Sequence, residues 1–254
     1  MRWSIFGGLA AALLMAAGTA LAAESEIELP ERHWSFDGLF GTFERDDVRR
    51  GYEVYRNVCA GCHGLTLIRY RELAALGYSE DEIKALAAEQ TYTDGPNDQG
   101  EMFERPGLPS DAFKAPFPNE QAARVANNGA YPPDLSLLVE ARAGGANHVY
   151  GVLIGYEEPP ADFPLKEGQY YNKYFPGHVI AMPPPLSDGA VTYPEGVEAT
   201  VPQMAADVTS FLAWTAEPTL EARKRMGVKS VLFLIVFTGL LYAVKRKIWL
   251  GVKH

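Results

Sequence analysis

The 254-residue sequence is poor in cysteine, with Cys59 and Cys62 alone, and it has five histidines. A fold held by disulfides is excluded if both thiols serve one site. The sequence also shows no Ser–His–Asp arrangement, no phosphate-binding loop and no metal-carboxylate cluster. Basic residues are scarce between Glu24 and Glu221, where 14 Lys and Arg oppose 32 Asp and Glu. Such a domain repels nucleic acid and attracts a basic protein, although solubility alone would also explain the charge.

The two thiols stand in the stretch Cys59-Ala60-Gly61-Cys62-His63. Two cysteines three positions apart, followed directly by histidine, are the attachment signature of a c-type haem. Each thiol adds to one vinyl group, and His63 then becomes the proximal ligand of the iron. A redox dithiol needs no adjacent histidine, and a zinc site needs more ligands than this stretch supplies. One such motif predicts a single covalently bound haem c.

Two apolar segments lie at the ends of the chain. Residues 1–23 resemble a secretory signal, with Arg2, an apolar run and the small-residue site Ala20-Leu21-Ala22. We expect cleavage near Ala22 or Ala23, and a retained N-terminal anchor is the alternative. Export fits the haem assignment, because bacteria attach haem covalently outside the cytoplasmic membrane. Residues 24–222 are then the periplasmic haem domain.

The second apolar segment, Ser230 to Val244, is fifteen residues without a charge. At 1.5 Å per residue it spans about 22 Å, short of a hydrocarbon core of about 30 Å, so a buried core helix is the alternative. Lys229 and Lys245 can lengthen the span by snorkelling, and no acidic residue follows Glu221. We therefore predict a single membrane anchor in residues 223–254. Its transmembrane part covers about 228–247, and the signal segment would place the short tail in the cytoplasm.

A mainly α-helical domain is expected between these ends. From about Asp46, Val48, Tyr52, Tyr55 and Cys59 recur at helical spacing and share a face. Gly51 near that face permits close approach by another helix, for which the segment Gln203–Thr215 is the natural partner. Other helices are expected over residues 80–90, behind a Ser79–Glu82 capping box, and over 119–126, 132–144 and 146–155.

The remaining segments are expected to be irregular. Residues 91–118 and 156–202 read as long loops rich in proline. The lead-in segment, residues 24–43, carries Trp34, Phe36, Phe40 and Phe43, which we expect to pack onto the body. Residues 80–104 hold eight acids and one base, Lys84. That segment is either a solvated face or a docking edge for a basic partner.

The iron needs a second axial ligand or an open position. Met182 precedes Pro183-Pro184-Pro185, and these prolines restrict the backbone, so a thioether can be held at the iron. His178 is the alternative. Met204 is expected in the core and Met102 in the acidic loop. His33, His148 and His254 are expected to be ordinary polar residues.

At this point the sequence resembles the cytochrome c1 family of the bacterial type. The resemblance covers nearly all of the expected mature chain. The stretches that carry it are Val58–His63, Asp94–Asn97, Gly100–Phe103, Ala122–Ser136, Tyr174–Gly177, Ala181–Leu186 and Lys224–Gly227. The first is common to c-type cytochromes, whereas the run from Asn127 to Leu135 and the single C-terminal anchor are far more specific.

The resemblance implies a class I cytochrome c-like haem domain with long loop insertions and one transmembrane helix. It implies that Met182 is the sixth ligand and that Arg124 approaches a haem propionate, the alternative for Arg124 being a solvated helix residue. It also implies a subunit of ubiquinol–cytochrome c oxidoreductase in the bacterial inner membrane. The family's partners are cytochrome b, the Rieske iron–sulfur protein as donor and a cytochrome c as acceptor.

Such a subunit transfers electrons and makes no bonds itself. A haem enzyme, such as a peroxidase or reductase, and a gas sensor are the competing functions. Both need an open or displaceable iron position, so added carbon monoxide distinguishes them from a closed His–Met haem.

Overall fold

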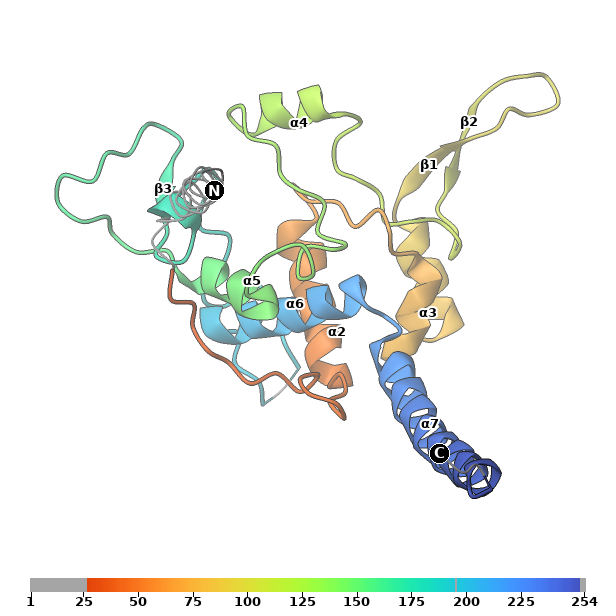
Figure 1. Ribbon diagram of the computed structural model, residues 1–254. Coiled ribbons are helices and arrows are strands. Elements are labelled where there is room, and N and C mark those ends of the chain that lie inside the picture. Colours follow the sequence, from red (N-terminus) through yellow and green to blue (C-terminus); the bar gives the residue numbers. More distant parts are fainter. Residues whose placement is uncertain (1–26, 195, 252–254) are drawn as a thin grey trace, which may run out of the picture.

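The computed structural model describes residues 27–194 and 196–251. The expected signal segment, residues 1–23, lies outside this range. The α-helices are α2 (Arg45–Val54), α3 (Glu80–Ala88), α4 (Glu120–Ala126), α5 (Gly145–Ile154), α6 (Val201–Ala216) and α7 (Leu220–Trp249). A π-helical turn, Tyr55–Cys59, continues α2, and 3₁₀ turns cover Tyr70–Leu76 and Pro176–His178. The fold is thus mainly helical, as predicted (Figure 1).

Helices α2 and α6 cross at the centre of the body, and α5 packs on α6 (Figure 1). The crossing is close because Gly51 has no side chain. A Cβ built on Gly51 would lie 2.0 Å from the Asp207 carbonyl oxygen and 2.7 Å from the Phe211 Cβ. The prediction that the Gly51 face meets the helix expected over Gln203–Thr215 is confirmed.

An ion pair fastens the same crossing. The Arg50 guanidinium donates to both carboxylate oxygens of Asp207, at 2.9 and 3.0 Å, and also donates to Asp47 at 2.6 Å. The Asp207 side chain is 1% exposed and that of Arg50 is 14% exposed. Gln203 donates a further hydrogen bond to Asp207 at 3.0 Å. The buried carboxylate therefore has its partners, as a buried charge must.

Aromatic and aliphatic side chains fill the core around this crossing. Tyr52 of α2 and Tyr55 of the π-helical turn pack on Phe211 of α6, with ring centroids 5.6 and 5.8 Å from that of Phe211. Met204 is fully buried, as expected for a core residue. Trp34, Phe36 and Phe43 from the lead-in segment are also buried. Phe40 is not, because it is 79% exposed, so the expectation that all four aromatic residues pack onto the body is wrong at this position.

The expected caps are present. Ser79 and Glu82 form the predicted capping box at the start of α3, and Asn119 accepts from the Ala122 backbone N–H at 2.9 Å to cap α4. These side chains satisfy backbone donors that a helix leaves unpaired at its first turn.

The segment expected to be a loop over residues 91–118 contains a β-hairpin. Strands β1 (Thr91–Asp94) and β2 (Phe103–Pro106) pair antiparallel and project away from the body (Figure 1). Arg105 donates to Asp94 and, at 2.6 Å, to Asp111, and so ties the base of the hairpin to the following loop. A second short pair, β3 (Tyr170–Tyr171) with β4 (Val179–Ile180), interrupts the other predicted loop.

The helix expected over residues 132–144 is absent, and that segment is built of turns. The reason is a set of long-range bonds. Leu135 donates its N–H to the Gly64 carbonyl oxygen at 2.9 Å, and Asp134 accepts from the Thr66 N–H and hydroxyl, both at 2.9 Å. These groups hold the segment against the chain after His63 instead of closing a helical ladder.

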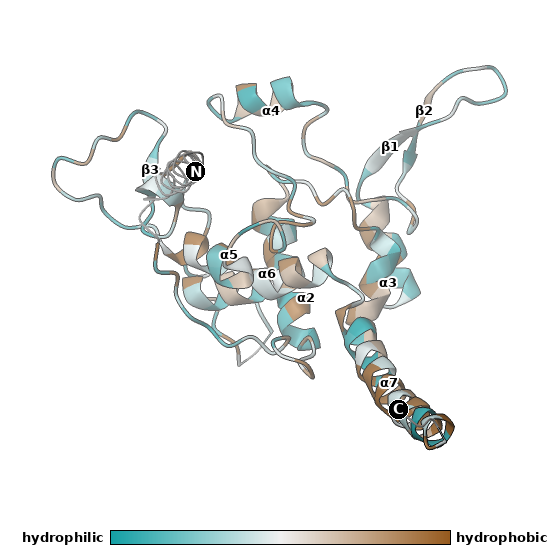
Figure 2. Ribbon diagram, viewed as in Figure 1, coloured by the Kyte–Doolittle hydropathy of each residue, from teal (hydrophilic) through white to brown (hydrophobic). Residues whose placement is uncertain are grey.

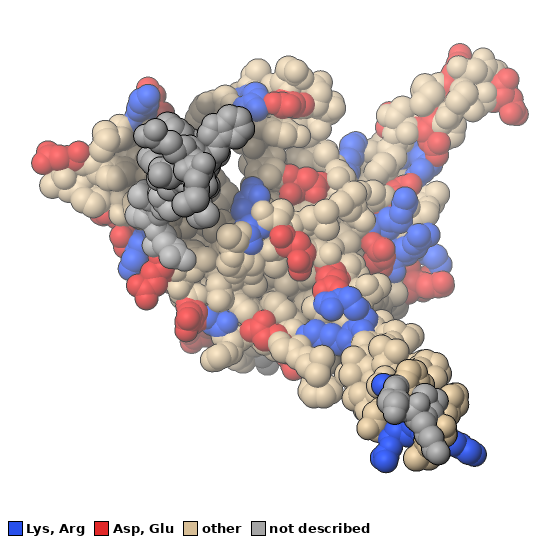
Figure 3. Space-filling model, viewed as in Figure 1, with Lys and Arg blue, Asp and Glu red and all other residues tan. Residues whose placement is uncertain are grey.

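Helix α7 leaves the body as one continuous 30-residue helix. Figure 2 shows apolar residues over most of its length, and Figure 3 shows basic side chains toward its end. By length and composition it can cross a membrane, and no residue of its apolar mid-part is buried against the body. The single C-terminal helix fits the predicted anchor, although it begins at Leu220, before the expected boundary at residue 223.

Candidate functional site: a covalent haem site

The π-helical turn brings α2 to the two thiols. The Ala60 N–H bonds to the Tyr55 carbonyl oxygen at 2.8 Å, and the Cys62 and His63 N–H groups both reach the Cys59 carbonyl oxygen, at 3.1 and 2.9 Å. The Tyr55 hydroxyl donates to the His63 carbonyl oxygen at 3.1 Å. Tyr55 therefore contacts the attachment stretch at two points, because its carbonyl oxygen accepts from Ala60, between the thiols, and its hydroxyl donates to the carbonyl oxygen of His63, after them.

The His63 ring is oriented by a backbone carbonyl. Its Nδ1 lies 2.8 Å from the Pro133 carbonyl oxygen, which requires a proton on Nδ1 and leaves Nε2 with a free lone pair. Burial lowers the pKa of His63, while the Pro133 carbonyl and the Asp134 carboxylate act in the opposite direction. A neutral imidazole with its second nitrogen hydrogen-bonded is the arrangement that a metal-ligating histidine needs.

The thiols differ in their surroundings. Cys59 is half-buried and Cys62 is exposed, and neither is in a disulfide. Burial, with a smaller contribution from Cys62, raises the pKa of Cys59 to about 12. A thiolate is thus disfavoured at this position, whereas a thioether carries no charge and suits it.

The Pro133 carbonyl is held in place by its neighbour Asp134. That carboxylate accepts from Thr66, described above, and from the Ser136 N–H at 2.8 Å. Burial alone would raise the pKa of Asp134, but the hydrogen bonds from Ser136 and Thr66 keep it below its ordinary value. The Ser136 hydroxyl accepts from the Leu67 N–H at 3.1 Å. Two segments about 70 residues apart are joined beside His63 in this way.

Three large apolar side chains in or beside these two segments are exposed. Leu67 is 62% exposed, Tyr131 52% and Leu137 47%. A large flat apolar group between the segments would cover such side chains, which water otherwise contacts. The donor set and this uncovered apolar surface both fit a haem.

Met182 and His178 lie on one stretch of chain but differ in what they contact. The Met182 side chain is half-buried, and its carbonyl oxygen accepts from the Tyr156 hydroxyl at 3.0 Å. The His178 ring stacks on Tyr171 with centroids 5.5 Å apart, and its Nδ1 lies 3.3 Å from the Asn172 carbonyl oxygen. The imidazole of His178 is therefore held by other groups of the protein, whereas the bond from Tyr156 to residue 182 uses the backbone carbonyl and not the thioether.

Arg124 is exposed on α4. Its Nε and Nη2 donate to Glu120, at 2.8 and 2.7 Å, and its Nη1 donates to the Gly129 carbonyl oxygen at 2.9 Å. The guanidinium also lies 5.6 Å from the centre of the Tyr131 ring. A guanidinium has five N–H groups, so two remain for another acceptor.

Sequence reasoning missed the roles of Tyr55, Pro133 and Tyr156. Tyr55 stands four residues before Cys59, so both lie on one helix face. That spacing could have indicated that Tyr55 contacts the attachment stretch. Pro133 lies in the segment 132–144, for which the sequence predicts a helix and no contact with His63. No local signal marks Tyr156, since its contact with Met182 spans 26 residues.

The acidic segment divides into paired and unpaired charges. Glu89 bonds to Arg56 at 2.7 Å, and Asp94 to Arg105, at the base of the hairpin. Near the hairpin tip, Asp98 and Glu101 are exposed and form no ion pair within residues 27–194 and 196–251. Figure 3 shows acidic side chains at the end of this projection. The tip therefore carries exposed negative charge that no cation in the described part of the chain neutralises.

Comparison with known proteins agrees with these features. The sequence profile described as the Cytochrome C1 family matches residues 34–252. Cytochrome c1 of Rhodospirillum rubrum is 48% identical over 263 residues, which cover 97% of both chains. Cytochrome b/c1 of Bradyrhizobium diazoefficiens is 51% identical over 91% of this chain, which spans 37% of that longer protein. A mitochondrial cytochrome c1 heme protein of Arabidopsis thaliana is 51% identical over 91% of this chain and 76% of its own length.

Proposed function

The chain belongs to the cytochrome c1 family, the haem subunit of the bc1 complex, and we propose that it carries one covalently bound haem c and passes single electrons through it. The observation that carries this proposal is the His63–Pro133 hydrogen bond of 2.8 Å beside Cys59 and Cys62. It leaves one imidazole nitrogen for the iron, next to the two thiols that bind the porphyrin edge.

Four side chains would hold the cofactor. Cys59 and Cys62 would supply thioether bonds, and His63 and Met182 would ligate the iron. The bound haem supplies a one-electron couple between ferric and ferrous iron. The preference for Met182 over His178 is supported by the ring stacking and backbone contact of His178. A neutral thioether favours ferrous iron and so keeps the reduction potential high.

Arg124 is proposed as a propionate partner. The bonds to Glu120 and Gly129 use three of its five N–H groups. A carboxylate can accept hydrogen bonds from the other two. Its position on the surface of α4 also fits a purely solvated residue, which the substitution Arg124→Gln tests through the potential.

The topology follows from the two apolar segments. We propose that residues 1–23 direct export and are removed, that residues 24–222 lie in the periplasm, and that α7 crosses the inner membrane once with its end in the cytoplasm. Cytochrome b shares that membrane in the proposed complex. The Rieske iron–sulfur protein would donate the electron, and a basic cytochrome c would accept it near the unpaired acids of the hairpin tip.

The test uses the full-length chain made in a bacterium with c-type haem maturation. We expect the haem to remain bound after acid–acetone extraction and denaturing electrophoresis, and to be lost in a variant with both Cys59→Ala and Cys62→Ala. Loss of haem from the unaltered protein would contradict the proposal.

The ligand assignment needs a matched set of variants. Met182→Leu should admit carbon monoxide and lower the reduction potential by on the order of 100 mV, since axial ligands span roughly 0.8 V among haem proteins. Met204→Leu makes the same exchange in the core and should leave spectrum and potential unchanged. If His178→Leu altered both and Met182→Leu neither, the sixth ligand would be His178. Carbon monoxide binding by the unaltered protein would favour an enzyme or a gas sensor.

A further inference from the structure

The loop Leu39–Thr42 carries apolar side chains that the body does not cover. Leu39 is 61% exposed and Phe40 is 79% exposed, whereas Phe36 and Phe43 on either side are buried. Single exposed apolar residues are ordinary, but two adjacent ones on a turn form a small apolar projection.

This projection is held firmly against the first turns of α7. The Lys224 ammonium donates to the Phe36 carbonyl oxygen at 2.6 Å and to that of Gly41 at 3.2 Å. Glu221 accepts from the Phe43 N–H at 3.1 Å. Hydrogen bonds from α7 thus hold both sides of the loop, and the exposure of Phe40 is part of the fold.

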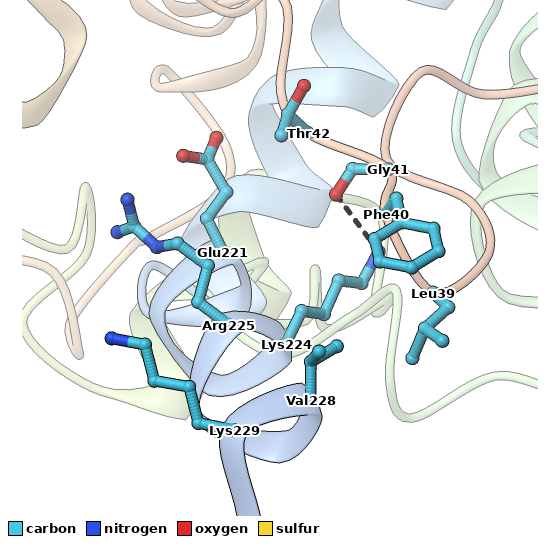
Figure 4. A pocket seen from close by; sticks show the side chains of 9 residues that line it. All are labelled: Leu39, Phe40, Gly41, Thr42, Glu221, Lys224, Arg225, Val228 and Lys229. Carbon is cyan, nitrogen blue, oxygen red and sulfur yellow. Dashed lines mark hydrogen bonds between the residues drawn. The ribbon is translucent and has the colours of Figure 1, made fainter. Parts of the chain in front are cut away.

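A hollow of about 320 Å³ lies between the loop and the helix. Figure 4 shows Arg225 and Lys229 extending to one side of it, and Leu39 and Phe40 lying on the other, with Val228 also on the wall. One edge is therefore cationic and the other apolar. The volume is at the lower end of small-molecule sites.

The charges at the hollow leave a net excess of cations. Glu221 bonds to Arg45 at 3.1 Å, so its carboxylate has a cationic partner. Lys224 is occupied by the two carbonyl oxygens. Arg225 and Lys229 form no ion pair with any residue in the described part of the chain. They stand four residues apart on one helix face and can approach the same anion.

The hollow lies at the level where a membrane begins. The uncharged stretch, residues 230–244, spans about 22 Å, so a hydrocarbon core of about 30 Å extends about 4 Å beyond each end. That boundary falls near Val228, and Arg225 lies about one turn farther out, at the level of the headgroups. Since Leu39 and Phe40 share the hollow with Val228, both edges lie at the level where the phosphates of a leaflet adjoin its glycerol and acyl groups.

We propose that this hollow binds one anionic phospholipid of the adjoining leaflet. Arg225 and Lys229 bind its phosphate, while Leu39, Phe40 and Val228 cover its glycerol and the first methylenes of a chain. A lipid fits better than a protein partner, because the hollow is small and combines a cationic edge with an apolar edge at the level where a leaflet presents phosphates beside glycerol and acyl groups. The inference needs α7 to span the membrane, and it needs neither the haem nor a particular orientation.

Native mass spectrometry of the purified full-length chain in detergent tests this, with dioleoyl phosphatidylglycerol as the probe. We expect a one-to-one complex that dioleoyl phosphatidylcholine forms more weakly. A variant with both Arg225→Gln and Lys229→Gln should bind phosphatidylglycerol about 30-fold less tightly, which is ~2 kcal/mol, or ~1 kcal/mol for each base near an anionic surface. Phe40→Ser should also weaken binding while leaving the charge unchanged.

The matched control is Arg246→Gln with Lys247→Gln, which removes two charges from the other end of the same helix and should leave the complex unchanged. Equal weakening in both double variants would show unspecific charge attraction and overturn the proposal. Displacement of the lipid by inorganic phosphate at millimolar concentration would overturn it as well. If lipid binding persisted while the Arg225 and Lys229 variant lost partner subunits during purification of the complex, the hollow would be a subunit contact. Because the readout is lipid mass, failed haem attachment leaves this test intact.

Discussion

The substitution Gly51→Ala tests whether the α2–α6 crossing determines the stability of the body. The added Cβ would lie 2.0 Å from the Asp207 carbonyl oxygen, whereas carbon and oxygen in close contact stay about 3.3 Å apart. The helices must therefore separate locally by about 1.3 Å. The obstacle is backbone, which cannot rotate away as a side chain can.

Two effects of opposite sign decide the size of the loss. Alanine is more favourable than glycine inside a helix by about 1 kcal/mol. Against this, overpacking a core costs about 1–3 kcal/mol and occasionally more, and the separation also loosens the contacts of Tyr52 and Tyr55 with Phe211. Since the backbone carbonyl cannot move aside, we expect an overpacking cost of about 3 kcal/mol, the top of that range. After subtracting the gain of about 1 kcal/mol from alanine, the free energy of unfolding should fall by about 2 kcal/mol.

Chemical unfolding of the full-length chain in detergent, followed by tryptophan emission, measures this loss, because Trp214 and Trp34 are buried in the body. Gly227→Ala on α7 is the matched control, since no atom lies within 4 Å of its added Cβ, and it should not destabilise the protein. Haem incorporation should fall with Gly51→Ala, because the π-helical turn that continues α2 carries Cys59. An unfolding midpoint for Gly51→Ala equal to that of the parent would refute the argument.

Two further predictions concern charge. Asp207→Asn should reduce the free energy of unfolding by about 3 kcal/mol, because it leaves Arg50 buried without its main partner. Replacing both residues with apolar ones (Arg50→Met with Asp207→Leu) should cost much less in the same unfolding assay. Equal losses in the two variants would contradict this argument. Electron transfer to a basic cytochrome c should slow as salt rises, since exposed charges are screened over about 10 Å at 0.1 M. Asp98→Asn with Glu101→Gln should flatten that salt dependence in stopped-flow kinetics. The control, Glu157→Gln with Glu158→Gln, changes two exposed acids elsewhere and should not flatten it. A rate independent of salt would remove the hairpin tip from the docking site.

Local patterns in the sequence were sufficient for much of the fold. The attachment stretch, the Ser79–Glu82 capping box and the helix spacing around Gly51 each depend on residues a few positions apart, and such spacing dictates which groups can meet. The apolar helix near the C-terminus is equally local, because its length and composition are properties of one segment. These features could be predicted because no distant residue is needed to form them.

Tertiary contacts decided the rest. Residues 132–144 have a helix-like opening, yet Thr66 and Gly64 bind that segment and prevent the helix. The free nitrogen of His63 depends on a carbonyl 70 residues away. Phe40 resembles its aromatic neighbours in sequence, but the bonds from Lys224 leave it facing outward at the start of α7. In each case a bond from a distant segment outweighs the local preference, because a buried or bridging hydrogen bond is costly to leave unmade.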